Sequence, residues 1–242
     1  MPNYGDPDYW EKRYEEQQGR TFDWLESYES LKPMIKEIID SSGKVLILGC
    51  GNAELGEDMY KDGFRDIENI DISEVVIGQM QARCESMPEM HWKVMDVRDL
   101  KYPSNFFDIA IDKSTIDALL CGDNSYINVA RMTKEVQRVL KVGGVYMAIS
   151  YGVPDNRLDH FEWKHLHWTV SYITLNEGTE NPHYVYLCRK KEGADEICEA
   201  NWKEVEENLN EEDEDDLKPD YDDDEDEDRN DEDVEESEKT NE

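Results

Sequence analysis

A glycine turn after a short apolar run is the first place where this chain could bind a ligand. Residues 45–55 read VLILGCGNAEL, so a predicted buried strand leads into Gly49-x-Gly51 and then into a helix. Such a turn lets the backbone approach a ligand closely, and the N-terminus of the helix offers unpaired N–H groups to an anion. The pattern predicts an anion-binding turn, although a purely structural turn has the same sequence signature.

Two carboxylates follow the next two predicted strands. Asp71 lies about 20 residues after the glycines, where an acidic side chain can accept hydrogen bonds from ribose hydroxyls. Asp96 follows the third strand, where a carboxylate can accept from an adenine amino group beside the amide of Val97. Open α/β sheets bind ligands at the edge where their parallel strands end. Either carboxylate alone could cap a helix or turn, but the ordered set predicts a nucleoside-containing ligand.

The residue three positions after Gly51 helps to distinguish two such ligands. A dinucleotide fingerprint places a third glycine at position 54, but Glu54 stands there. The negative charge of Glu54 disfavours a pyrophosphate and therefore a nicotinamide dinucleotide. S-adenosylmethionine would bring its methionine carboxylate to the same helix N-terminus, and it fits the pattern better.

The elements that must position these residues alternate between strands and helices. A strand, a crossover helix and the next strand form a parallel unit, and two closely spaced final strands indicate a hairpin. The sequence therefore predicts an α/β fold: a Rossmann-like, doubly wound, mostly parallel seven-stranded sheet with a terminal antiparallel hairpin and a disordered C-terminal tail. The strands are expected at 45–48, 67–70, 91–95, 107–111, 145–150, 168–175 and 183–189, and the main helices at 8–14, 28–39, 54–62, 74–84 and 126–140.

The charge of the chain is unevenly distributed. It has 60 acidic and 26 basic residues and a net charge of -34, and its acidic residues are most concentrated after Lys203. That region has too few apolar residues to offset the entropy of ordering. We expect three regions: an N-terminal aromatic and helical lid segment (1–42), a Rossmann-like core (43–192) and an acidic disordered tail (193–242). Bulk nucleic-acid binding is not expected, whereas a basic protein partner is electrostatically favoured.

Composition also bears on metals and on location. The five cysteines are scattered without a CxxC pair, and His165-x-His167 has no further ligand nearby, so we expect no metal site and no disulfide framework. The opening MPNYGDPDYW has no apolar signal core, and no run approaches the roughly 20 apolar residues of a membrane span. A cytoplasmic location is expected, with the nucleus as an alternative.

Several segments, taken together, are similar to one protein family. They read LILGCGN, ENIDIS, VMDVRDL, FFDIAIDKSTIDALL and VLKVGG, in this order. The chain resembles the seven-strand methyltransferase superfamily and, within it, the elongation factor 1A lysine methyltransferases. The specific features are the opening YWEKRY (9–14), the step FDW (22–24) and the segment DKSTIDAL (112–119). The resemblance implies S-adenosylmethionine as cofactor and a protein substrate such as elongation factor 1A, which is typically a basic protein.

The resemblance also implies which residues contact the cofactor. The aromatic residues among them suit a ligand with a sulfonium charge, and their segment could close over it as a lid. Two positions depart from common patterns: Ile47 replaces an acidic residue of many methyltransferases, and Ser114 replaces the family glycine beside the expected methyl-transfer mouth. The implied cofactor-binding residues are Trp10, Tyr14, Trp24, Gly49, Gly51, Asp71, Ile72, Asp96, Val97 and Lys113.

Asp112 and Lys113 are the predicted catalytic residues. A lysine acceptor must arrive as a neutral amine, and Asp112, at the end of the fourth predicted strand, is a candidate to take its proton. The N/D-P-P-aromatic segment of adenine methyltransferases does not occur at this position. Two alternatives stay open: a small-molecule or RNA methyltransferase, and a catalytically silent cofactor-binding interaction module.

Overall fold

The computed structural model describes residues 3–17 and 20–216 and contains a seven-stranded sheet. Its strand order is β3-β2-β1-β4-β5-β7-β6. All neighbours up to β5 pair in parallel, whereas β7 is antiparallel to both β5 and β6. The predicted mostly parallel sheet with a terminal antiparallel hairpin is therefore confirmed. The strands are β1 Val45–Leu48, β2 Ile67–Asp71, β3 Met90–Val94, β4 Phe107–Lys113, β5 Leu140–Ser150, β6 Trp168–Leu175 and β7 His183–Lys190.

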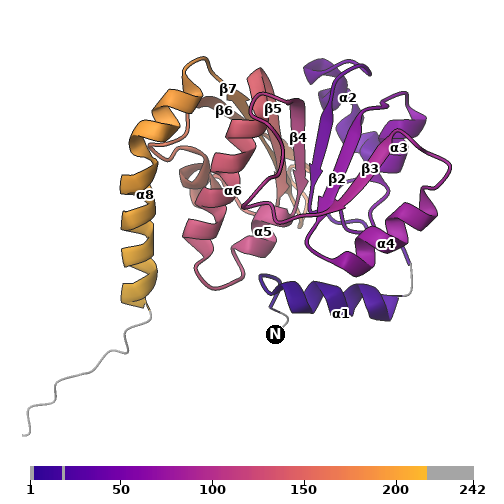
Figure 1. Cartoon of the computed structure of the whole chain (residues 1–242), viewed down its shortest axis with the longest axis horizontal. Coiled ribbons are helices and arrows are strands. Elements are labelled where there is room, and N and C mark those ends of the chain that lie inside the picture. The colour runs from indigo at the N-terminus through magenta and orange to yellow at the C-terminus, as the bar shows by residue number, and fades with distance from the viewer. Residues whose placement is uncertain (1–2, 18–19, 217–242) are drawn as a thin grey trace, which may run out of the picture.

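Helices cover both faces of the sheet (Figure 1). One face packs against α2, α3 and α4, and the other against α6. Alternation along β1 explains this arrangement, because Val45 and Ile47 point into the first cluster while Leu46 and Leu48 point into the second. The helices are α1 Pro7–Gln17, α2 Tyr28–Ile38, α3 Leu55–Lys61, α4 Glu74–Arg83, α5 Thr115–Leu119, α6 Ser125–Val139, α7 Pro154–Arg157, the 3₁₀ helix η1 Leu158–Phe161, and α8 Ala194–Asp216.

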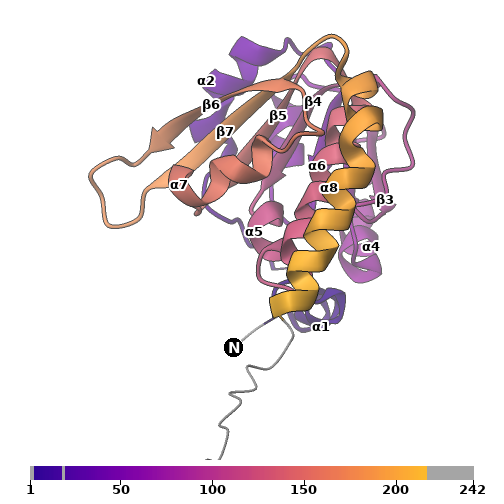
Figure 2. The same cartoon turned by 90° about the vertical axis from the view of Figure 1, so that its left-hand side faces the viewer.

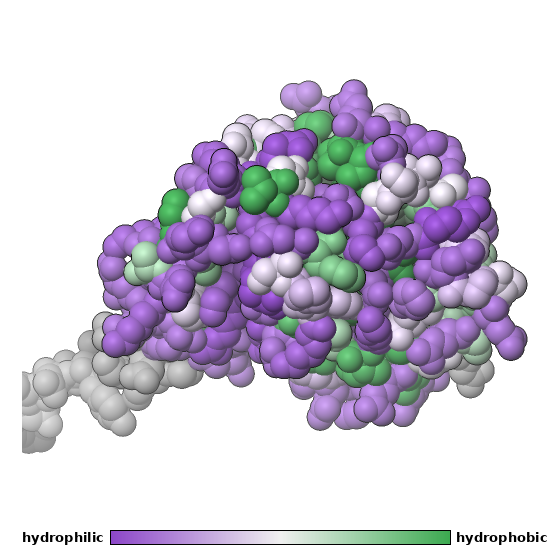
Figure 3. All heavy atoms as spheres, turned by 45° about the horizontal axis from the view of Figure 1, so that its top comes forward, coloured by the Kyte–Doolittle hydropathy of each residue, from purple (hydrophilic) through white to green (hydrophobic). Residues whose placement is uncertain are grey.

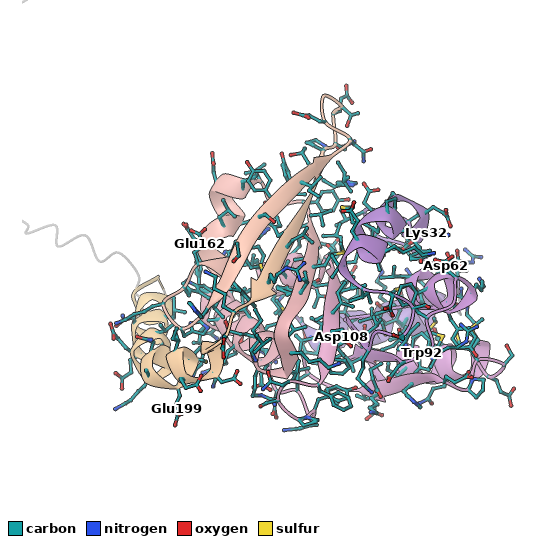
Figure 4. All side chains as sticks on the ribbon, turned by 90° about the horizontal axis from the view of Figure 1, so that it is seen from above. Lys32, Asp62, Trp92, Asp108, Glu162 and Glu199 are labelled. Atoms are coloured by element: carbon teal, nitrogen blue, oxygen red, sulfur yellow. The ribbon has the colours of Figure 1, made fainter. Side chains whose placement is uncertain are left out.

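The expected N-terminal lid segment 1–42 has two structural parts. Helix α1 crosses the end of the molecule where the parallel strands finish, next to α4 and α5 (Figure 1). Helix α2 instead belongs to the core, because Leu31 and Ile35 are fully buried against the sheet. At the outer side of α2, Lys32 lies beside Asp62 of the segment after α3, with their charged atoms 2.9 Å apart (Figure 4).

The C-terminal region differs from its prediction. The helix α8 begins at Ala194, so the expectation of a disordered tail beginning at 193 is wrong for residues 194–210. The helix runs alongside α6 (Figure 2), where Val205 and Leu209 are buried against Ile127 and Ala130. These few apolar residues recur with helical spacing, a signal that the acidic composition of the region obscured. Residues 217–242, the rest of the predicted tail, lie outside the described part of the chain.

We expect the packing of α8 to contribute measurably to stability. Replacing Leu209 with alanine removes buried apolar contacts with α6 and should lower the free energy of unfolding by about 2 kcal/mol. Urea denaturation measures this change, and Asn208→Ala, at an exposed position on the same helix, is the matched control. Equal stability of the two variants would contradict a structural role for α8.

The face of the molecule that Figure 3 shows is mainly hydrophilic, with small separate apolar patches. Within residues 3–17 and 20–216, none of the helices combines the length and the apolar character that crossing a membrane requires.

Candidate functional site

A cavity of about 570 Å³ opens at the sheet edge where the parallel strands end. It lies between the ends of β1, β2 and β4 and the segment that contains α1. Every residue that the sequence predicted for cofactor binding lines it, from Trp10 to Lys113, whereas Asp112 does not. The structure thus brings together residues that are more than a hundred positions apart in the chain, in a space that can enclose a small molecule.

At both glycine positions of the turn after β1, the backbone conformation and the neighbouring atoms disfavour any residue with a side chain. Gly49 and Gly51 have φ angles of +56° and +53°, which side chains rarely adopt. A β-carbon on Gly49 would lie 2.2 Å from Oγ1 of Thr115, and one on Gly51 would lie 2.8 Å from the hydroxyl of Tyr14. The turn therefore keeps backbone, rather than side chains, at the floor of the cavity.

Asp71 ties the end of β2 to this turn. Its carboxylate is buried and accepts hydrogen bonds from the amide of Gly51 at 2.9 Å and from the amide of Ser73 at 3.0 Å. Burial raises the pKa of Asp71, because desolvation outweighs the stabilisation that these amides give the charged form. Ile72, the next residue, is exposed and also lines the cavity. The carboxylate has acceptor capacity beyond its two amide bonds, which matches its predicted role toward ribose hydroxyls.

Asp96 lies two residues after the end of β3, which is shorter at this end than predicted. Its carboxylate accepts from Nε and NH2 of Arg98 at 3.0 and 2.7 Å. Burial favours the neutral acid, but the hydrogen bonds from Arg98 outweigh it and hold the pKa of Asp96 below its ordinary value. Val97, also predicted, is buried beside it. Sequence reasoning missed Arg98, although it follows Asp96 directly in the segment VMDVRDL.

Aromatic rings from the N-terminal segment cover the cavity. Trp10 stacks on Tyr14 with ring centroids 6.0 Å apart, and Trp24 meets the edge of Phe22 at 4.9 Å. The guanidinium of Arg13 lies 5.0–5.6 Å from the ring centroids of Trp10, Phe22 and Trp24. These rings form an apolar wall that already accommodates one cation, as cation–π attraction favours.

Lys113, at the end of β4, holds the segment that carries Phe22 and Trp24. Its ammonium is buried, pairs with the carboxylate of Asp23 and donates to the carbonyl oxygen of Glu26 at 3.0 Å. Burial lowers the pKa of Lys113 to about 7, whereas the adjacent Asp23 carboxylate favours the charged form. A substitution at Lys113 should therefore alter the positions of Phe22 and Trp24 in the cavity wall as well as the charge inside the cavity.

Glu26 in turn anchors this segment to the terminal hairpin. Its buried side chain accepts from the amide nitrogen of Asn176 at 2.9 Å and lies 2.8 Å from Nδ1 of His183. Burial alone would raise the pKa of Glu26, but hydrogen bonds from Ser30 and His183 lower it overall. The N-terminal segment is thus fixed both to the centre of the sheet and to its far end.

The geometry does not support Asp112 as the group that takes a proton from an acceptor. Its carboxylate is fully buried outside the cavity lining and accepts from the amides of Thr115 and Ile116 and from the hydroxyl of Tyr146, at 2.7–3.1 Å for the closest contacts. It satisfies the free N–H groups at the start of α5, which is a capping role. Sequence reasoning placed Asp112 at the correct strand but could not tell which way its side chain points.

A pH-dependent measurement can confirm this structural role. Burial raises the pKa of Asp112 from 3.8 to about 7. An acid with a higher pKa in the folded state opposes folding once it ionises, so this residue costs stability progressively as the pH rises through that range. The stability of Asp112→Asn relative to the wild type should therefore increase between about pH 4 and about pH 7 and then level off. Denaturation curves across this range test it, and a constant difference would contradict it.

Sequence reasoning missed a second cluster on the cavity wall, centred on Asp117 of α5. Its carboxylate accepts from Oγ of Ser150 at 2.5 Å, NH2 of Arg157 at 2.8 Å, Oγ of Ser114 at 3.1 Å and the amide of Tyr151 at 3.2 Å. Ser114 has a φ of +71°, a backbone conformation that suits the family glycine better than serine. Asp117 belongs to the DKSTIDAL segment, but Arg157 lies in the short helix α7, for which the sequence has no clear signal.

Comparisons with known proteins agree with this architecture. Residues 45–144 match a family model described as a methyltransferase domain. The chain is 43% identical over 150 residues to the eEF1A lysine and N-terminal methyltransferase of Mus musculus, which covers 61% of this chain but only 22% of that relative. It is 30% identical over 196 residues to EEF1A lysine methyltransferase 4 of Bos taurus, covering 77% of this chain and 76% of that relative.

Solved structures share the fold. A SAM-dependent methyltransferase of Methanosarcina mazei aligns with a TM-score of 0.53 at 16% identity, over 66% of this chain and 97% of that one. A TehB-like SAM-dependent methyltransferase of Corynebacterium glutamicum aligns with a TM-score of 0.55 at 16% identity, over 76% and 98% of the two chains. At this identity the likeness concerns the fold alone.

Proposed function

Because this chain belongs to the methyltransferase family that includes EEF1A lysine methyltransferase 4, we propose that it transfers methyl groups from S-adenosylmethionine to lysine side chains of a protein. The observation that carries the proposal is one cavity that brings together the glycine turn, Asp71, Asp96 and the aromatic wall. Bound there, S-adenosylmethionine would supply a methyl group made electrophilic by its sulfonium.

The residues of the cavity fit this ligand in chemical type. The turn at Gly49 and Gly51 offers backbone to the methionine part, the carboxylate of Asp71 suits ribose hydroxyls, and Asp96 with Val97 suits the adenine edge. Aromatic rings favour a cationic sulfur at close range. Glu54, by contrast, stands where a dinucleotide-binding turn has its third glycine, and its side chain pairs with Arg83 outside the cavity lining.

The chain's own contribution to methyl transfer is to bind, orient and exclude water. An apolar cavity wall also favours the neutral form of an entering lysine, which must have a free electron pair on Nζ in order to react. Lys113 acts by holding the segment 23–26 over the site. Lys113 was predicted both to bind the cofactor and to act in catalysis, and holding this segment over the site would serve both purposes.

Elongation factor 1A is the proposed substrate. The relatives at 30–43% identity carry this factor in their names. The net charge of -34 would attract a basic protein and speed its encounter, more at low salt than at high salt. A small-molecule or RNA acceptor and a silent binding module are the alternatives that the experiment must separate.

The decisive experiment incubates the enzyme with tritiated S-adenosylmethionine and purified elongation factor 1A, followed by mapping of methyl marks by mass spectrometry. We expect a mark on a lysine of the factor. Label in RNA or in a small molecule would overturn the protein substrate, and tight cofactor binding without label in any fraction of a cell extract would indicate the silent module.

Cofactor binding has its own expected result. A ligand present at a hundred times its dissociation constant adds about 2.7 kcal/mol to the stability of the folded state. S-adenosylmethionine and its demethylated product should therefore raise the melting temperature of the full chain, as thermal denaturation would show. NAD serves as the control, and a shift with NAD but not with S-adenosylmethionine would refute the proposal.

A further inference from the structure

Tyr151 stands out on the rim of the cavity because its ring is exposed while its backbone is tightly held. The ring is 52% exposed and lines the cavity together with Ser114 and Lys113. Single exposed aromatic residues are ordinary on protein surfaces. What distinguishes this one is its place at a cavity mouth and the number of contacts that fix the residues around it.

Three hydrogen bonds fix Tyr151 and the residues on either side of it. Its amide donates to Asp117 at 3.2 Å, and Oγ of Ser150, the preceding residue, donates to the same carboxylate at 2.5 Å. On the other side, the carbonyl oxygen of Gly152 accepts from the hydroxyl of Tyr186 at 2.6 Å. The rim therefore presents an aromatic ring from a prearranged backbone, which lowers the entropy that a binding partner must overcome.

Arg157 adds to these contacts and neutralises the charge of Asp117. Its guanidinium donates to Asp117 at 2.8 Å and to Oγ of Ser150 at 3.1 Å, with both charged side chains largely buried. It also lies directly against Gly152, where an added β-carbon would be 2.2 Å from NH2. Asp117 is thus fully engaged in holding the rim and is not a free base for the acceptor.

From these contacts we infer that Tyr151 binds the acceptor side chain and that Asp117 holds Tyr151 in position to do so. This inference rests on the proposed protein-lysine methyltransferase activity. An aromatic ring attracts an ammonium group through its face and packs against the methylene groups of a lysine. Tyrosine is also enriched among the residues that contribute most to recognition, and its side chain has few rotatable bonds to fix on binding. The ring of His183 packs edge-on against Tyr151 at 5.2 Å and supports it from the hairpin side.

The test separates acceptor recognition from cofactor binding. For the wild type and each variant of the full chain, the dissociation constant of S-adenosylmethionine is measured by calorimetry, and kcat and KM are measured with elongation factor 1A as acceptor. Tyr151→Ala should raise KM for the acceptor about tenfold and leave cofactor affinity within twofold. Tyr151→Phe retains the ring and should stay near the wild type. Tyr172→Ala, at a 48% exposed ring on β6 outside the cavity, is the matched control and should change neither constant.

The positioning role of Asp117 requires a different readout. Asp117→Asn keeps the shape of the side chain but weakens its hold on Arg157 and the rim, so kcat/KM for the acceptor should fall while the cofactor dissociation constant stays within twofold. Unchanged acceptor KM in Tyr151→Ala, with the wild type active, would overturn the inference alone. Absence of protein-lysine methylation by the wild type would instead overturn the proposed function and this inference with it.

Discussion

Asp71→Ala is expected to weaken S-adenosylmethionine binding by at least a hundredfold. The carboxylate is buried at the cavity floor, holds the amide of Gly51 at 2.9 Å and has further acceptor capacity facing the site. A hydrogen bond to a charged group contributes ~1.5–3 kcal/mol, so losing those to two ribose hydroxyls removes about 3 kcal/mol or more. Isothermal titration calorimetry measures the effect directly.

Two further variants make this result interpretable. Asp71→Asn retains one acceptor oxygen for the glycine turn and should bind with intermediate affinity. Asp99→Ala removes an exposed carboxylate outside the cavity and should bind as the wild type does. If Asp71→Ala folds normally, as its circular dichroism melt without ligand would show, and still binds within threefold of the wild type, Asp71 is not a cofactor ligand.

Lys113→Met is expected to release the aromatic wall and to weaken cofactor binding by roughly thirtyfold. Methionine fills a similar volume but leaves Asp23 and the carbonyl oxygen of Glu26 without their shared donor. An unsatisfied buried polar group costs ~1–3 kcal/mol, and much of this cost can be relieved only if the segment 22–26 moves away from the cavity.

Hydrogen exchange distinguishes this effect from a local loss of charge. Amides in the segment 22–26 should exchange faster in Lys113→Met than in the wild type without ligand, while amides of β1 and β2 should not change. Lys141→Met is the control, because Lys141 pairs with Asp108 near the start of β4, at the opposite end of this strand from Lys113. Unchanged exchange in 22–26, together with cofactor affinity within twofold of the wild type, would contradict the anchoring role.

Several strands could be predicted closely because they are short, apolar and bounded by turn residues. β1 and β6 have the predicted bounds, and β2 differs only by including Asp71. The largest error was at α8, where an acidic composition outweighed a weak apolar periodicity that becomes meaningful only against α6. The insertion of β7 between β5 and β6 was not predictable, since pairing partners depend on tertiary packing.

Site residues whose position follows from the backbone pattern could be predicted. Site residues whose role depends on the direction of the side chain could not. Gly49, Gly51 and Asp71 follow from strand ends and glycine conformation, and all three line the cavity. Asp112 and Asp117 have the same chemistry and lie five positions apart in the chain. The structure places Asp112 beneath α5 and Asp117 on the cavity wall. Their different neighbours, Tyr146 and Arg157, come from distant segments that a single sequence does not connect.

The position of β7 also has a consequence for the synthesis of the protein on the ribosome. A nascent chain that has left the ribosome as far as Ser150 already exposes every predicted cofactor contact, yet β5 has no partner on its outer side and Glu26 has no His183 to contact. At ~5–20 residues per second, translation from there to Lys190 lasts roughly 2–8 s. During those seconds an exposed strand edge is open to other nascent chains. The contact between Glu26 and His183, one anchor of the segment that carries Phe22 and Trp24, therefore forms only after β7, the last strand within the described residues, is available.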